Sequence, residues 1–156
     1  MTAAKTVRSS QVIMTQLVLP THTNALDTVF GGTVMSWIDI SAAIAAQRHS
    51  GRDVVTASMD QLSFVAPIRK GWVVNLKASV NFTSRTSMEI GIRVEAENPK
   101  TSEIFHTASA YMTFVALGSD GKPTEVPKLT LEDDIEKRRF AAAQKRREQR
   151  LLNLKV

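Results

Sequence analysis

The sequence predicts an α+β domain in which an antiparallel sheet wraps around one long central helix, with an additional C-terminal helix. Residues 31–48 predict the central helix, because they are rich in Ala, contain no interior Gly or Pro, and would place small or apolar side chains on every side. Later segments alternate apolar and polar residues with a period of two, which is typical of antiparallel strands with one packed face.

The first half of the chain contains one expected strand and the central helix. Residues 10–19 are rich in β-branched and apolar types and end at Pro20, which predicts a strand. A loop of Thr, Asn and Asp then leads to Gly31-Gly32. The helix should run from these glycines to about Arg48, because His49-Ser50-Gly51 is a typical helix stop.

Four strands are expected after the helix, at residues 52–65, 72–82, 87–96 and 103–117. The alternation is cleanest in the middle two, where every even position from 72 to 82 and from 88 to 96 is apolar. The connection 83–86 is short enough for a hairpin. A sheet curled around one helix leaves a surface that a second copy can cover, so we expect at least a dimer.

The chain is divided on this basis into one domain at 8–118, a linker at 119–129 and a basic helix at 130–156. A length of 156 residues is most simply one domain. Gly and Pro are frequent between 118 and 129, which indicates a loop. Thr130 and Asp133 resemble a capping box, which predicts that the last helix starts there.

The composition excludes several classes of protein. No segment approaches the roughly 18 apolar residues of a membrane span, and the N-terminus does not resemble a secretion signal. The absence of Cys rules out disulfides and a Cys nucleophile and fits a cytoplasmic protein. Of the net charge of +5, the segment from Leu131 onward contributes +3, so the charge is weak evidence for nucleic acid, which we do not expect as a partner.

Asp39 is the only charged residue of the apolar stretch 31–47. Such a carboxylate is either structural, capping a loop or pairing with an Arg, or a general base made more basic by partial desolvation. Gly31-Gly32 either form a tight entry turn or let a ligand approach the free N–H groups of the first helical turn. A donor pair and a carboxylate on one helix suggest the addition of water to an acyl group.

The stretch THTNALDTVFGGTVMSWIDISAAIAAQRH resembles the loop and central helix of the hotdog-fold acyl-CoA thioesterases. The similarity continues through ASMDQLSFVAPIRKG and NFTSRTSMEIGIRVEAEN and covers about residues 10–117. The resemblance implies a hotdog fold, hydrolysis of fatty acyl-CoA to fatty acid and CoA, and self-association as a dimer and commonly as a trimer of dimers.

The resemblance also implies roles for individual residues. Asp39 would be the general base or the nucleophile. Asn24 would orient the water or the thioester from the facing subunit, and the backbone N–H of Gly32, with that of Gly31, would polarise the thioester carbonyl. The site would then lie across the dimer interface.

Two loops offer cations and hydroxyls for the phosphates of CoA. Arg69-Lys70 follows the second expected strand after Pro67, and Arg85-Thr86-Ser87 lies at the tip of the next hairpin. The alternative for both is an ordinary charged turn. CoA enters as part of the substrate, so we expect no separate cofactor, and the three His residues lack ligand spacing, so we expect no metal.

Two other functions are compatible with parts of this pattern. A non-catalytic acyl-CoA sensor could use the basic tail to bind nucleic acid. Hydration of an enoyl thioester is the third possibility, but such relatives usually place a His beside the acid, and the residues around Asp39 contain none. The preferred acyl chain length stays open.

Overall fold

The computed structural model of the protein describes residues 3–154. The elements, in chain order, are β1 (Lys5–Thr6), β2 (Val12–Leu17), α1 (Gly31–Ser50), β3 (Asp53–Phe64), β4 (Val73–Thr83), β5 (Ser87–Asn98), β6 (Glu103–Leu117), β7 (Leu129–Thr130) and α2 (Asp134–Asn153), with 3₁₀ turns at Arg8–Ser10 and Pro20–His22. In the order of its main elements the chain follows the prediction.

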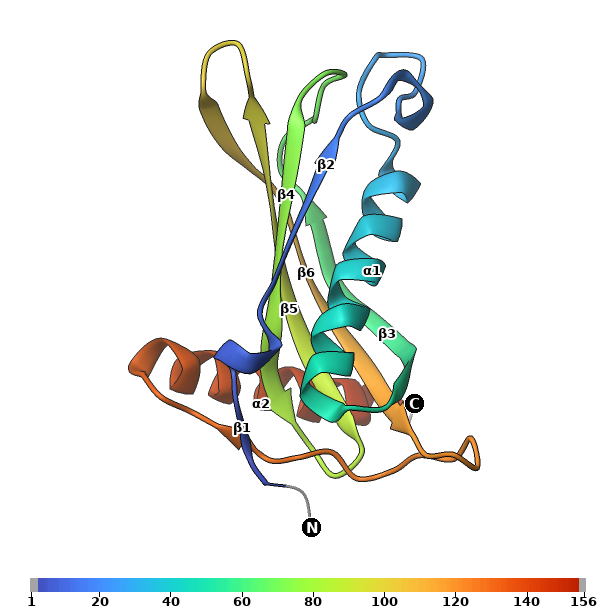
Figure 1. The fold of residues 1–156 in the computed structure, drawn as a ribbon, viewed down its shortest axis with the longest axis vertical. Helices are drawn as coiled ribbons and strands as arrows, with labels where there is room; N and C mark the ends of the chain where they lie inside the picture. Colours follow the sequence, from blue (N-terminus) through green and yellow to red (C-terminus); the bar gives the residue numbers. More distant parts are fainter. Residues whose placement is uncertain (1–2, 155–156) are drawn as a thin grey trace.

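A five-stranded antiparallel sheet forms the body of the molecule, in the order β2-β4-β5-β6-β3. The long helix α1 lies along one face of this sheet, roughly parallel to the strands (Figure 1). The predicted antiparallel sheet with one long helix is therefore confirmed. Strands β2 and β3 are the two edges.

The core lies between α1 and the inner face of the sheet. Small side chains on α1, including Ala42, Ala45 and Ala46, are fully buried, which brings the helix close to the strands. The even positions of β4 supply buried residues such as Leu76 and Val80, as the alternation predicts. The helix ends at Gly51, whose φ of 66° is the left-handed conformation that glycine adopts without strain.

One side of α1 is not covered by the described chain. Met35 and Ile40 are 41% and 48% exposed, and on the neighbouring edge strand β3 Val55 and Phe64 are also about half exposed. The small and apolar side chains that the sequence places on every side of this helix are thus covered on the sheet side only. An apolar strip beside an unpaired strand edge is a surface that further protein covers in natural sheets.

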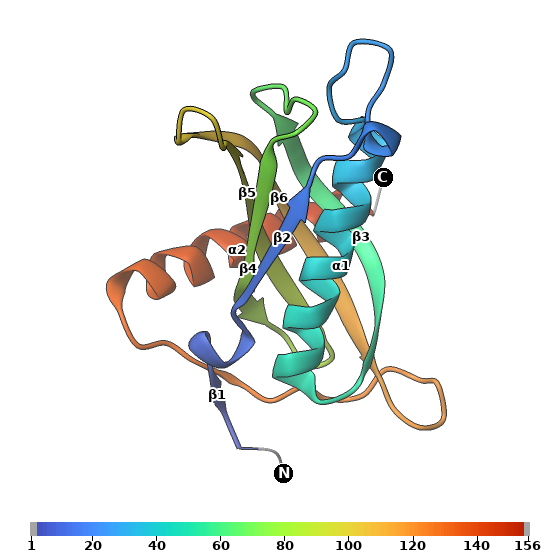
Figure 2. The same ribbon diagram turned by 45° about the horizontal axis from the view of Figure 1, so that its top comes forward.

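The C-terminal helix α2 packs on the opposite face of the sheet from α1, as the two views show (Figures 1 and 2). Phe140 contacts Phe82 of β4 with ring centroids 4.8 Å apart. Arg146 donates two hydrogen bonds to the buried carboxylate of Glu89, at 2.8 and 3.0 Å, and stacks on the ring of Tyr111.

The structure corrects the predicted start of the last helix, because α2 begins at Asp134 and not at Thr130. Thr130 belongs to β7, which pairs with β1 in a small parallel sheet that the alternation did not predict. The N-cap is Asp133, whose carboxylate accepts from Glu136 N at 2.8 Å. No helix within residues 3–154 is long and apolar enough to cross a membrane.

Candidate active site

Asn24 organises the loop that leads to α1. Its side-chain oxygen accepts from Leu26 N at 2.9 Å and from the N and Oγ1 of Thr28 at 3.3 and 3.2 Å. These bonds occupy Oδ1, whereas Nδ2 donates to no acceptor within residues 3–154. Asn24 is exposed, so its amide can offer N–H donors to a ligand while its oxygen holds the loop.

Two backbone donors are free at the start of α1. The N-cap residue Phe30 makes no side-chain cap, and within the described residues the N–H groups of Gly31 and Gly32 have no acceptor. A Cβ on Gly32 would lie 2.6 Å from Cε1 of Phe30, so the glycine also makes room for that exposed ring. The helix start combines unused N–H groups with the positive end of the helix dipole, which suits an oxygen gaining negative charge.

Asp39 is held by a residue that the sequence analysis did not single out. Thr56 of β3 donates its hydroxyl to Oδ1 of Asp39 at 2.7 Å. Within residues 3–154 nothing donates to the other carboxylate oxygen, Oδ2, and the side chain is half-buried. Thr56 fixes one oxygen and leaves the second available to a water molecule. The contact of Thr56 with Asp39 depends on how β3 lies against α1, which the sequence does not reveal.

The structure separates Asp39 from the glycines along the helix. Asp39 follows Gly31 by eight residues, which at about 1.5 Å per residue is about 12 Å along the axis. One carbonyl oxygen bound at the helix start and a water bound directly to the same protomer's Asp39 would therefore be too far apart to react. The predicted pair lies on one helix but does not form one contact site within a protomer.

The two predicted phosphate-binding loops lie at opposite ends of the sheet. Arg69 forms an antiparallel backbone bridge with Thr28, and Lys70 N donates to Asp27 O. Both cationic residues therefore lie beside the Asn24 loop. In contrast, the 85–87 turn lies near the C-terminal end of α1, because Ala116 N donates to Thr86 O and β6 ends there. A 20-residue helix separates the ends by about 30 Å.

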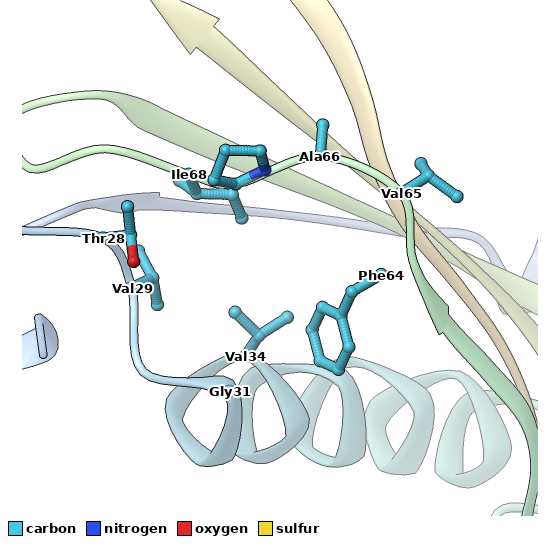
Figure 3. A pocket seen from close by; sticks show the side chains of 9 residues that line it. Thr28, Val29, Gly31, Val34, Phe64, Val65, Ala66 and Ile68 are labelled. Carbon is cyan, nitrogen blue, oxygen red and sulfur yellow. The ribbon is translucent and has the colours of Figure 1, made fainter. Parts of the chain in front are cut away.

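An apolar pocket of about 360 Å³ opens at the start of α1 (Figure 3). The lining residues come from the loop before the helix, its first turn, and the end of β3 with the loop that follows. They are Thr28, Val29, Gly31, Val34, Phe64, Val65, Ala66, Pro67 and Ile68. The pocket therefore lies next to the free backbone donors, and its apolar wall contains no charged side chain.

Residues 26–103 match the thioesterase superfamily. A Bacillus subtilis protein named as an uncharacterized acyl-CoA thioester hydrolase is 42% identical over 129 residues, which cover 83% of this chain and 75% of that protein. The chain belongs to the thioesterase superfamily. The expected family of hotdog-fold acyl-CoA thioesterases is confirmed, and with it the enzyme class of thioester hydrolases.

Solved structures of this family agree with the fold over nearly the whole chain. A hexameric acyl-CoA thioesterase is 38% identical with a TM-score of 0.94, covering 98% of both chains. A Staphylococcus aureus acyl-CoA hydrolase, solved with butyryl-CoA and CoA, is 37% identical with a TM-score of 0.90, covering 96% of this chain and 92% of that one.

Structures of the Staphylococcus aureus acyl-CoA hydrolase with single replacements concern the same three residue types as this site. Its structures include single Ala replacements of an Asn, an Asp and a Thr. The spacing of those three residues along that chain equals the spacing of Asn24, Asp39 and Thr56 here. The two chains therefore share this set of residue types at the same intervals.

Proposed function

We propose that the protein hydrolyses fatty acyl-CoA thioesters to a free fatty acid and CoA. The observation that carries the proposal is the Asp39 carboxylate, held at Oδ1 by Thr56 and open at Oδ2. The free N–H groups of Gly31 and Gly32, and the relatives named as acyl-CoA hydrolases, support it. The substrate brings its own CoA, so the proposal includes no separate cofactor.

The proposed step is the attack of water on the thioester carbonyl. Oδ2 of Asp39 accepts a proton from the water as its oxygen bonds to the carbonyl carbon. The carbonyl oxygen gains negative charge and is stabilised by the N–H groups of Gly31 and Gly32. When the intermediate collapses, the C–S bond breaks, and the CoA sulfur takes the proton that Asp39 received. Direct attack by Asp39 is the alternative.

We infer that a complete site contains residues of two protomers. The separation of about 12 Å along α1 supports this inference, because Asp39 of one copy can then act on a thioester held by Asn24 and Gly31 of the other. The exposed strip of Met35, Ile40 and Val55 next to the free edge of β3 supplies the surface for such a dimer.

The dimer also gives the 85–87 turn a place in the proposed site. If two β3 edges pair antiparallel around a twofold axis, each protomer's 85–87 turn lies at the end of the dimer where its partner's α1 begins. Arg69 and Lys70 of one copy and Arg85 of the other would then flank the same CoA. A trimer of such dimers is the proposed assembly, supported by the hexameric relative. A cytoplasmic location stays an expectation from the sequence.

The position of α2 gives little support to the alternative, a non-catalytic acyl-CoA sensor whose basic tail binds nucleic acid. Arg146 and Arg150 of the basic tail are engaged with Glu89 and Asp60 on the sheet, at 2.8 and 2.9 Å. Gel-shift experiments at low salt measure whether the remaining cations bind nucleic acid, and we expect no shift.

The test is thiol release from acyl-CoA esters by wild type and Asp39→Asn. The chain contains no Cys, so a thiol reagent reports only the CoA set free. The Asn variant keeps the shape and the Thr56 contact but loses the base, and we expect kcat to fall by about 10³-fold or more. Asp53→Asn, on the exposed end of β3, is the matched control. An Asp39→Asn rate equal to wild type would remove the assignment.

A further inference from the structure

The wall of the pocket at the start of α1 favours an alkyl chain over the pantetheine arm of CoA. Pantetheine carries two amide groups, which lose water on burial and need partners. The side chains of the wall are apolar except for Thr28, whose hydroxyl already donates to Asn24, and Val29 N donates to Ile68 O. An acyl chain has no such groups, and it gains free energy from burial against the apolar lining.

The position of the pocket places it next to the reacting carbonyl of the proposed hydrolysis. Gly31 belongs both to the wall and to the pair of free backbone donors. A thioester oxygen held by those donors leaves the first carbons of the acyl group at the mouth of the cavity. The cations Arg69 and Lys70 follow Ile68 directly on the exposed loop, where the anionic part of CoA can stay in water.

Phe64 forms one end of this cavity. It is the last residue of β3, and its ring projects toward α1 and lies beside Val34, on the side of the pocket away from Val29 and Ile68 (Figure 3). A Cβ built on Gly31 would lie 4.0 Å from Cζ of Phe64, so the ring tip is in contact range of the first helical turn. The ring therefore bounds the pocket on this side, next to the first turn of α1.

We propose that this pocket holds the acyl chain and that the Phe64 ring sets the longest chain it accepts. The proposal rests on the proposed hydrolysis and specifies its substrate. Chains that end before the ring fit within the pocket. Longer chains must displace the ring or leave methylenes in water, and they lose the free energy that burial of those methylenes would give. The side chain is 50% exposed in one protomer, so a smaller residue opens the pocket without emptying the core.

The experiment measures kcat/KM for a series of saturated acyl-CoA esters with wild type, Phe64→Ala and Phe64→Trp. We expect Phe64→Ala to raise the ratio of long-chain to short-chain kcat/KM by about tenfold or more. Phe64→Trp should lower that ratio, because it shortens the cavity. Ile104→Ala, an exposed apolar residue on β6 away from the pocket, is the control and should leave the profile unchanged.

The outcomes separate the two proposals. No hydrolysis of any ester by the folded wild type would overturn the proposed function. Wild-type hydrolysis with the same chain-length profile in both Phe64 variants, or with a uniform loss across all lengths, would overturn the role of Phe64 alone. If Phe64→Ala does not fold, as judged by circular dichroism, the opposite shift expected of Phe64→Trp decides the question.

Discussion

His49 is a buried residue whose chemistry is not used by the proposed reaction. Its side chain is fully buried at the end of α1, Nε2 bonds to Pro127 O at 2.7 Å, and Nδ1 has no partner within residues 3–154. Burial lowers the pKa of His49, more than the bond to Pro127 raises it, and the nearby Lys5 lowers it further. The imidazole therefore stays neutral in the fold at pH values where the unfolded chain is protonated.

This difference predicts a loss of stability in mild acid. As the pH falls below the unfolded His pKa of about 6.5, the unfolded chain binds a proton that the folded chain does not, so the free energy of unfolding falls. We expect the urea midpoint to drop between about pH 7.5 and about pH 5.5. His49→Gln keeps a donor for Pro127 but cannot titrate, and its midpoint should drop less. Equal drops in the two proteins would contradict the prediction.

Individual site residues differ in how far the sequence reveals them. Asp39 stands out because it is the one charge in an apolar helical pattern, and Gly31-Gly32 stand out because they open that helix, with Asn24 in the loop before them. Thr56 does not stand out, since Thr is common in strands and its contact with Asp39 depends on the register of β3 against α1. A local pattern can identify one end of a hydrogen bond but not its partner across the fold.

At the scale of elements, α2 is attached to the sheet by a buried ion pair. Glu89 is 4% exposed, and it also accepts from Asn81 Nδ2 at 3.1 Å, so its carboxylate is surrounded by donors. Removing the cation would leave a buried carboxylate without its charge partner.

The prediction for this contact is a large loss of stability in Arg146→Met. We expect the free energy of unfolding to fall by about 3–5 kcal/mol, because Glu89 loses its partner. Arg93→Met removes a cation from an exposed pair with Glu95 at 3.0 Å and should cost at most about 1 kcal/mol. Both are measured by urea unfolding followed by circular dichroism. Equal effects would show that burial does not strengthen the role of the Glu89 pair.

Elements with a strong period were predicted more accurately than those that depend on distant pairing. β4 and β5 follow the alternation closely, and α1 ends at the predicted Gly51. The start of α2 was placed too early, because Thr130 is drawn into β7 by its pairing with Thr6. A two-residue strand has no period to read, and its existence depends on where the other end of the chain lies.

The fold leaves one apolar surface of the molecule uncovered. The free edge of β3 and the exposed side of α1 lie next to each other, and both contain half-exposed apolar residues such as Val55 and Ile40. Asp39, on the same helix, is half-buried in one protomer. A second copy on this surface would complete both the packing of α1 and the surroundings of Asp39. Assembly and catalysis are then expected to depend on each other.

Mixing two inactive variants tests this dependence directly. Asn24→Ala and Asp39→Asn should each be nearly inactive alone, because every site in either homodimer lacks one group. If Asn24 and Asp39 of one site come from different protomers, a co-expressed mixed dimer contains one intact site, and we expect thiol release to recover to about a quarter of the wild-type rate for random pairing. Half of the dimers are then mixed, and each of these has one of two sites intact. If both residues act within one protomer, no intact site forms on mixing, and an activity equal to the sum of the two separate variants would refute the shared site.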